Sequence, residues 1–280
     1  MAPLSPALAP LERAIAGPDE AWLRERLAAT GAAARDGLAT AFPALARRLG
    51  RTGLAGRVDA DGVRADLGAW RRCDAAGALL LAAADPVEDE RVVDLFRHGD
   101  LEERTVLLRA AVVRPLSKAT SDLLDEVQRT NVVAHLEAAC CDGNLLVRAL
   151  DGGLLSRERF DRLVLKLAFL DLPLARLDGV RARPSTELTR MLLDLASERE
   201  AAGRPVWRDT LRMAAGAPTP GTVARVLGGL EHGDAGWRLA SAEAFATLAR
   251  PDLAPFARER LAREARADVR AALERALSTR

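Results

Sequence analysis

The chain has 280 residues, of which 41 are Lys or Arg and 40 are Asp or Glu, so its net charge is +1. This balance excludes binding to nucleic acid through an excess of basic charge. Three cysteines are too few for a disulfide framework, the first ten residues do not form a secretory signal, and no apolar run approaches the ~18 residues of a transmembrane helix. We therefore expect a cytoplasmic protein with no transmembrane segment.

Helix-forming residues dominate the chain, whereas β-branched and aromatic residues are sparse. This composition predicts an all-α fold. In the first part of the chain, residues 1–84, apolar spacing predicts helices near residues 19–30, 34–49 and 62–84. The glycines between residues 50 and 56 form the loosest predicted linker.

Sharper helix boundaries follow from residue 85 onward. Asp85 before Pro86 predicts a helix start that leads to an end at Gly99. Asp100 with Glu103 forms a predicted capping box, which starts a helix over residues 101–113. Further helices are predicted near residues 121–141, 156–170, 185–202, 205–215 and 221–231.

The last part of the chain, residues 207–280, contains a faint internal repeat. Asp234, Trp237 and Arg238 are matched further on by residues 268–270, which read Asp-Val-Arg. The pattern is similar to the HEAT-type repeat, in which two helices form a hairpin that stacks on its neighbours. We therefore predict one elongated domain over residues 1–280, with residues 85–206 as its core. We expect this domain to consist of stacked antiparallel helical hairpins in a HEAT-like or α-α superhelical arrangement.

Motifs for metal binding and catalysis are missing from the sequence. His98, His135 and His232 lie far apart and outside any HExxH context, and two adjacent cysteines on a helix point about 100° apart. Neither a GxSxG nucleophile elbow nor a phosphate-binding loop is present. We therefore predict no metal, no cofactor and no catalytic residue, which indicates a protein that is not an enzyme.

Asn131 is the first candidate for a binding residue. It lies on the apolar stripe of the predicted helix 121–141, where an unpartnered buried amide would cost about 1–3 kcal/mol. It therefore needs a partner, either the backbone of a neighbouring loop or a ligand in a cavity. Arg129 lies beside it, although an ion pair with Asp125 also explains that residue.

Lys166 is the second candidate, because its predicted helix is apolar nearly all round and should be buried. A lysine there must reach solvent with its amine or pair with an acid. The chain has only one other lysine, Lys118, so a lysine at this position indicates a specific requirement. Structural pairing, ligand contact and a reactive amine are the alternatives. His98 has a simpler explanation at a helix C-terminus, where basic residues are favoured.

Four segments resemble, in the same order, the conserved segments of the EboA family. The first reads Phe-Arg-His-Gly-Asp-Leu-Glu-Glu-Arg over residues 96–104 and continues to residue 110. The others are residues 129–133 with 137–138, residues 164–170 with 173–174 and 176, and residues 187–192 with 198–199 and 202–205. The sequence departs from the family pattern at residues 141–146, which lack an aromatic residue, and at residues 161–163.

The resemblance implies a bacterial protein from a gene cluster of secondary metabolism that moves metabolites or their precursors toward the cell envelope. It also implies cluster partners: a membrane prenyltransferase and proteins similar to sugar isomerases, hydrolases and dehydroquinate synthases. It supplies no catalytic residues.

The first predicted function is therefore that of a non-catalytic accessory protein that binds proteins of the same cluster or a small hydrophobic metabolite. An enzyme with a pocket around Lys166 and Glu137 is one alternative. A pure protein–protein scaffold, peripherally associated with a membrane enzyme, is the other. The candidate binding residues are His98, Arg104, Arg129, Asn131, Glu137 and Lys166.

Overall fold

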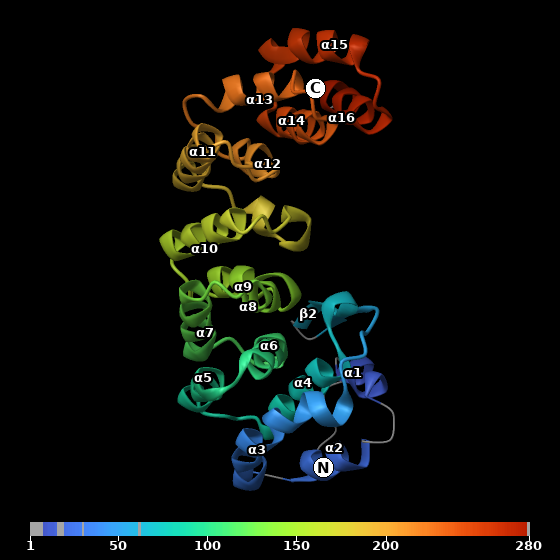
Figure 1. Cartoon of the computed structure of the whole chain (residues 1–280), viewed down its shortest axis with the longest axis vertical. Helices are drawn as coiled ribbons and strands as arrows, with labels where there is room; N and C mark the ends of the chain where they lie inside the picture. The colour runs from blue at the N-terminus through green and yellow to red at the C-terminus, as the bar shows by residue number, and fades with distance from the viewer. Residues whose placement is uncertain (1–7, 16–19, 30, 61–62, 279–280) are drawn as a thin grey trace. The chain divides into compact units, whose positions relative to one another are not determined.

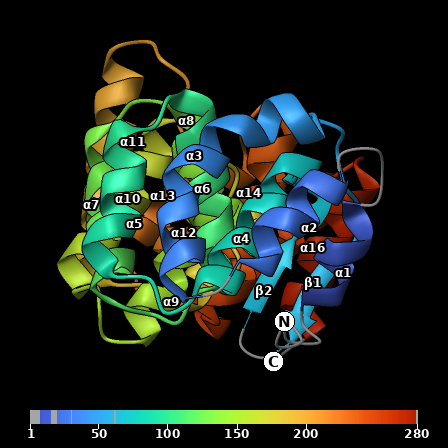
Figure 2. The same cartoon turned by 90° about the horizontal axis from the view of Figure 1, so that it is seen from below.

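The computed structural model describes residues 8–15, 20–29, 31–60 and 63–278, and it is helical almost throughout (Figures 1 and 2). The strands of the described residues form one two-stranded hairpin, so the predicted all-α class is confirmed. The chain divides into two compact units, Met1–Arg157 and Glu158–Arg280, which are described separately below. The single domain expected over residues 1–280 stays a prediction.

The first unit is built around α4 (Arg72–Ala84), an Ala- and Leu-rich helix that is almost wholly buried. It packs against α3 (Gly31–Leu49) on one side and α6 (Leu101–Ala110) on another. A helix that is apolar nearly all round needs such cover on every side. The remaining elements are α1 (Ala9–Ala14), α2 (Glu20–Ala28), β1 (Arg57–Ala60), β2 (Val63–Asp66), α5 (Asp89–His98), α7 (Lys118–Arg129), α8 (Val133–Leu136) and α9 (Leu145–Asp151).

The prediction of a helix over residues 62–84 is wrong in its first half. The chain instead forms the antiparallel β1–β2 hairpin and a single 3₁₀ turn, Leu67–Ala69, before α4 begins at Arg72. The Asp66 carboxylate accepts a hydrogen bond from Gly68 N at 2.9 Å, which caps the turn and offers the backbone an alternative to the α-helix. The helix expected to start after Asp85 also begins later, at Asp89.

The capping box at Asp100 is confirmed. Its carboxylate accepts hydrogen bonds from Glu102 N and Glu103 N, both at 2.8 Å, and the Glu103 carboxylate accepts one from Asp100 N at 3.4 Å. Helix α6 therefore begins where the sequence predicts, and it continues into a 3₁₀ turn, Ala111–Val113.

The single helix expected over residues 121–141 is wrong. Helix α7 ends at Arg129, where Thr130 adopts an extended conformation and its hydroxyl accepts a hydrogen bond from Val132 N at 3.1 Å. This local bond competes with the helical pattern. The chain resumes as α8 and passes directly into a π-helix, Glu137–Asp142.

The second unit contains two helical hairpins at its C-terminal end. Helices α13 (Thr222–Leu230) and α14 (Ala235–Leu248) form one, α15 (Ala254–Arg263) and α16 (Ala267–Ser278) form the other, and α14 packs against α16. Phe245 is fully buried in their shared core. The preceding elements are α10 (Arg157–Phe169), α11 (Thr186–Ala201) and α12 (Thr210–Ala214).

The two arginines of the sequence repeat have equivalent roles. Arg238 Nη1 donates to His232 O at 2.9 Å, and Arg270 Nη1 donates to Glu264 O at 3.2 Å. Each arginine lies on the second helix of its hairpin and holds the turn that follows the first helix. Both carbonyl groups lie just after the end of a helix, where the carbonyl oxygens have no intrahelical hydrogen-bond donor.

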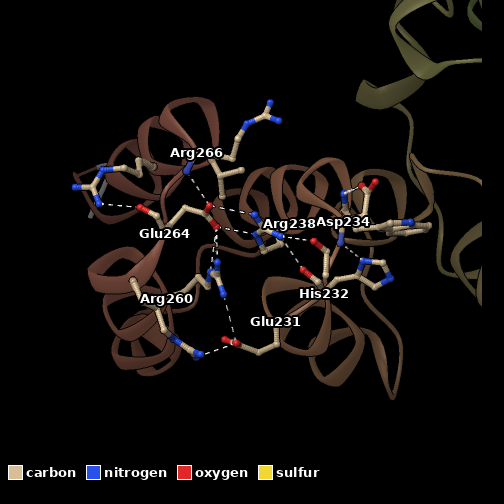
Figure 3. Close-up of polar contacts among 12 residues, drawn as sticks. Glu231, His232, Asp234, Arg238, Arg260, Glu264 and Arg266 are labelled. Carbon is tan, nitrogen blue, oxygen red and sulfur yellow. Dashed lines mark hydrogen bonds and ion pairs between the residues drawn. The ribbon is translucent and has the colours of Figure 1, made fainter.

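A buried carboxylate joins the two hairpins (Figure 3). The fully buried side chain of Glu264 accepts hydrogen bonds from Arg238 Nε at 2.7 Å, Arg260 Nη2 at 2.7 Å and Arg266 N at 2.9 Å. The hydrogen bonds from Arg238, and then those from the Arg266 backbone and Arg260, lower the pKa of Glu264 to about 2. The carboxylate is therefore ionised at neutral pH and ties the segment before α16 to α14.

Adjacent glycines of α13 predict opposite effects of the same substitution. A Cβ on Gly228 would meet no atom within 4 Å, whereas a Cβ on Gly229 would lie 2.0 Å from Ser241 Oγ. We expect Gly228→Ala to stabilise the second unit by about 0.5–1 kcal/mol through helix propensity. Gly229→Ala should destabilise it by about 1–3 kcal/mol through overpacking against α14. Denaturant unfolding of both variants provides the measurement, and equal shifts would contradict the tight α13–α14 contact.

No helix among the described residues has both the length and the apolar character needed to cross a membrane.

Candidate ligand-binding groove

A groove of about 470 Å³ lies between α10 and α11 in the second unit. We call it the Lys166 groove. Each wall is one face of a helix, because its residues follow the spacing i, i+3, i+4, i+7 that places side chains on the same side. The wall from α10 consists of Arg162, Leu165, Lys166 and Phe169, and the wall from α11 consists of Met191, Asp194, Leu195 and Glu198.

The two walls differ in charge and share an apolar floor. The α10 wall carries two basic side chains, and the α11 wall carries two acidic ones. Of the acids, Asp194 is held by Arg190 Nη1 at 2.8 Å on the same helix. Leu165, Met191 and Leu195 remain partly exposed between the charged rims. The groove thus offers an apolar surface with few charged groups, which is typical of a site for a small amphipathic molecule.

Lys166 occupies this groove because of its position on α10. Its neighbours in sequence, Leu163, Val164 and Leu167, are buried in the core, whereas Lys166 itself is half-buried and lines the groove. This partial burial lowers the pKa of Lys166 from its usual value, since it disfavours the charged ammonium.

Phe169 extends the apolar surface at the end of α10. It is 57% exposed, an unusual exposure for a side chain of this size. Arg199 fixes this end of the groove: its guanidinium lies 5.2 Å from the Phe169 ring centroid, and it donates to the carbonyls of Phe169 and, at 2.8 Å, Pro205. The aromatic ring is therefore held by a cation–π contact rather than by burial.

Five other candidate residues lie in the first unit, and none of them lines this groove. His98 is exposed at the end of α5, where Nδ1 lies 2.9 Å from Asp94 O. Arg104 donates to Arg97 O at 2.8 Å and lies over the Phe96 ring. Glu137 is half-buried at the start of the π-helix.

The proposed burial of Asn131 is wrong. The break between α7 and α8 removes this residue from the apolar stripe, and its side chain is exposed, as is that of Arg129. Arg129 forms an ion pair with Glu126, at 3.5 Å, where the sequence predicted Asp125 as its partner. Asn131 and Lys166 also belong to different compact units.

Sequence reasoning missed a buried ionic cluster in the first unit. The fully buried Asp74 carboxylate of α4 accepts hydrogen bonds from Arg71 Nε at 3.0 Å and Arg109 Nη1 at 2.8 Å. Arg109 also donates to Asp142 in the π-helix, Nε to Oδ2, at 3.0 Å. The signal was an acidic residue inside the Ala- and Leu-rich segment of α4, which must be paired when it is buried.

The π-helix was also missed, although π-helices occur frequently at functional sites. Buried His135 precedes it, with Nε2 3.1 Å from Leu101 O and Nδ1 without a partner among the described residues. Burial lowers the pKa of His135, and the positive charge of Arg104 acts in the same direction. The hydrogen bond to Leu101 opposes them but is a weaker effect than burial. The ring is therefore kept neutral in a packed position between α6 and Phe96.

Cys73 and Cys140 do not have the environment of reactive thiols. Burial, reinforced by the negative charge of Asp74, raises the pKa of Cys73 to about 11, and burial raises that of Cys140 as well. A reactive cysteine needs a lowered pKa, because the thiolate is the nucleophile. Among the described residues, no group of three or more His, Cys, Asp or Glu side chains is arranged to hold a metal ion.

The fold and the Lys166 groove together define a mostly helical protein with an amphipathic groove on its surface. The family model described as "Metabolite traffic protein EboA" matches residues 8–214, which is well over half of the chain. The chain therefore belongs to the EboA family. No curated protein and no solved structure matches the chain.

Proposed function

We propose that the protein is a non-catalytic accessory protein of metabolite traffic that binds a small hydrophobic metabolite carrying an anionic group. The family supports a role in metabolite traffic. The observation that carries the binding proposal is the amine of Lys166 beside the apolar side chains of Leu165 and Leu195. The apolar body of the metabolite would cover the floor, and its anionic end would pair with Lys166.

Burial of apolar surface would drive binding in this groove, and the charge of Lys166 would orient the ligand. The groove volume of about 470 Å³ lies in the range of small-molecule sites. An apolar ligand chain that covers Leu165, Met191 and Leu195 removes its own surface and the groove floor from water. This burial supplies binding affinity but does not fix the orientation of the ligand. The ammonium of Lys166 supplies direction, because a carboxylate or phosphate placed elsewhere in the groove would approach Asp194 or Glu198.

The test compares two probes of equal length, dodecanoate and dodecan-1-ol, by titration calorimetry. We expect Lys166→Met to weaken dodecanoate binding by about tenfold, the loss of one charge-assisted hydrogen bond, and to leave dodecan-1-ol unchanged. Leu195→Asp should weaken both probes, since it places a charge on the apolar floor. Lys118→Met is the matched control, because Lys118 is exposed and pairs with Asp122 on α7.

Three results would contradict the proposal. Wild-type protein that binds neither probe has no functional groove of this kind. Equal affinity of Lys166→Met and wild type for dodecanoate would remove the role of the amine. Turnover of a cluster metabolite by the purified protein alone would instead make it an enzyme.

A second candidate is the docking of partner proteins from the same gene cluster, which the exposed Phe169 favours. Aromatic side chains of this exposure are enriched in protein interfaces. Co-purification with a cluster protein that is lost on Phe169→Ser, without any loss of dodecanoate binding, would favour this candidate.

We also propose that the C-terminal hairpins are HEAT-like and that the protein works in the cytoplasm. Equivalent turn contacts of Arg238 and Arg270 support the repeat. None of the three cysteines, all of them described, forms a disulfide, which suits a reducing compartment. Fluorescence of a tagged protein in cell fractions tests the compartment.

A further inference from the structure

A second cavity, separate from the Lys166 groove, lies among α11, α12, α13 and the first turn of α14. It has a volume of about 380 Å³, which suits a small molecule. Its lining includes the apolar side chains of Ala196, Val206 and Leu211. It also includes polar side chains and two glycines: Glu200, Arg204, Thr210, Arg225, Gly228, Gly229, His232 and Trp237.

Arg204 contributes a positive charge to this cavity. Gly203, with φ +63°, ends α11 in the left-handed conformation, and Arg204 N donates to Arg199 O at 2.8 Å. This helix end places Arg204 at the cavity. Its guanidinium has no hydrogen-bond or ion-pair partner within residues 8–15, 20–29, 31–60 and 63–278.

The other two charges of the cavity neutralise each other. Arg225 Nη1 donates to Glu200 Oε1 at 2.9 Å, and Arg225 Nη2 donates to Glu200 Oε2 at 3.0 Å and to Ser197 Oγ at 2.8 Å. This bidentate pair occupies the carboxylate of Glu200. The cavity is therefore left with the excess positive charge of Arg204, which disfavours a cationic ligand.

His232 contributes one hydrogen-bond donor, its Nε2–H group, to the cavity. Its Nδ1 accepts from Asp234 N at 3.0 Å, so the proton of the neutral ring is on Nε2 (Figure 3). The ring lies 5.7 Å from the Trp237 ring, centroid to centroid, at an angle of 46°. The Trp237 indole N–H has no acceptor in the part of the chain that the structure describes.

We propose that this cavity binds a small anion with a flat apolar body, either a carboxylate or a phosphate. Arg204 and the His232 Nε2–H supply donors for the anionic group, while Trp237 and the apolar lining residues supply surface for the body. The proposal does not depend on the Lys166 groove. Arg204 lies within the matched region 8–214, but His232 and Trp237 lie beyond it, so the complete site requires the C-terminal hairpins.

The test uses three probes of one shape on the full chain: 1-naphthoate, 1-naphthyl phosphate and the neutral 1-naphthalenemethanol. Titration calorimetry gives the affinities, and the indole N–H resonances of the four tryptophans give the location. We expect the anionic probes to bind more tightly than the alcohol and to shift the Trp237 resonance selectively. The tighter of the two anionic probes identifies the anionic group as carboxylate or phosphate.

Two variants test separately the positive charge of Arg204 and the open space of the cavity. Arg204→Gln should weaken the anionic probes by about tenfold or more and leave the alcohol unchanged. Gly228→Leu should abolish binding of all three, because the space beside Gly228 is open and a large side chain would fill it without a clash at its Cβ. Arg250→Gln, an exposed arginine paired with Asp252, is the matched control.

Lys166→Met distinguishes this cavity from the groove, since it should leave naphthoate binding unchanged. Absence of binding to wild type, or unchanged binding to both Arg204→Gln and Gly228→Leu, would overturn the proposal. Loss of naphthoate binding in Lys166→Met would also overturn it, because the probe would then occupy the groove.

Discussion

Replacing Glu264 with Gln is expected to destabilise the second unit by about 3–5 kcal/mol. Its fully buried carboxylate is the shared acceptor for Arg238 and Arg260. An amide of the same shape cannot balance two guanidinium charges, and it must turn a donor toward at least one of them. Removal of one partner from a buried ionic cluster typically has this cost, because the remaining charges stay buried and unpaired.

Hydrogen exchange of the α14 and α16 amides would measure this loss within the second unit. Glu259→Gln is the matched control, because Glu259 is 71% exposed and contacts Arg263 at 3.5 Å on the same helix. An exposed pair of this kind contributes little to stability. Equal protection in Glu264→Gln and wild type would show that the cluster does not hold the two hairpins together.

The same carboxylate predicts an acid dependence of stability. The pKa of Glu264 is lowered to about 2 in the folded chain, from 4.5 for a free side chain. Since the folded state binds the proton more weakly, the contribution of Glu264 is complete above pH 4.5 and is lost as the pH falls toward 2. The difference in unfolding free energy between wild type and Glu264→Gln should therefore shrink across this window.

Asp74→Asn is expected to destabilise the first unit by a similar amount, about 3–5 kcal/mol. The carboxylate is fully buried and accepts from Arg71 N at 2.7 Å, as well as from the side chains of Arg71 and Arg109. Arg109 in turn holds Asp142 of the π-helix. Loss of Asp74 should therefore loosen the contact of α4 with α6 and reach the π-helix.

Hydrogen exchange in α4, α6 and residues 137–142 provides the measurement for Asp74→Asn. Asp36→Asn is the matched control, because Asp36 is 69% exposed and pairs with Arg91 at 2.7 Å. The same loss of protection in both variants would indicate a general effect of net charge. Loss confined to Asp74→Asn would confirm the cluster as the support of the π-helix.

Helices with strong local signals were predictable from the sequence. The capping box of Asp100 and Glu103 satisfies orphan N–H groups within four residues of chain, so it needs no distant partner. Helix α11 was likewise predicted close to its observed bounds, Thr186–Ala201, because Ser185 caps it and its apolar spacing is regular. Such features are decided by neighbours in the chain.

Features that depend on competing local bonds were not predictable. The helix expected over residues 121–141 had a suitable apolar stripe, but the Thr130 hydroxyl bonds to Val132 N and interrupts it. The expected helical start near residue 62 was likewise replaced by the β1–β2 hairpin, which no persistent alternation of apolar residues indicated. In both places, pairing that the apolar pattern does not reveal replaces the expected helix: a side-chain bond to the backbone in one case and a strand partner in the other.

The candidate site shows the same division. Composition, helical period and local motifs predicted an all-α member of the EboA family and the unusual position of Lys166 on an otherwise apolar helix, because these are properties of the chain alone. The packing of the helices was needed to show that Lys166 lines a groove with α11, that Asn131 is exposed, and that Arg204, His232 and Trp237 line one cavity. These arrangements depend on which helix faces pack together, and that choice is made by residues far apart in the sequence.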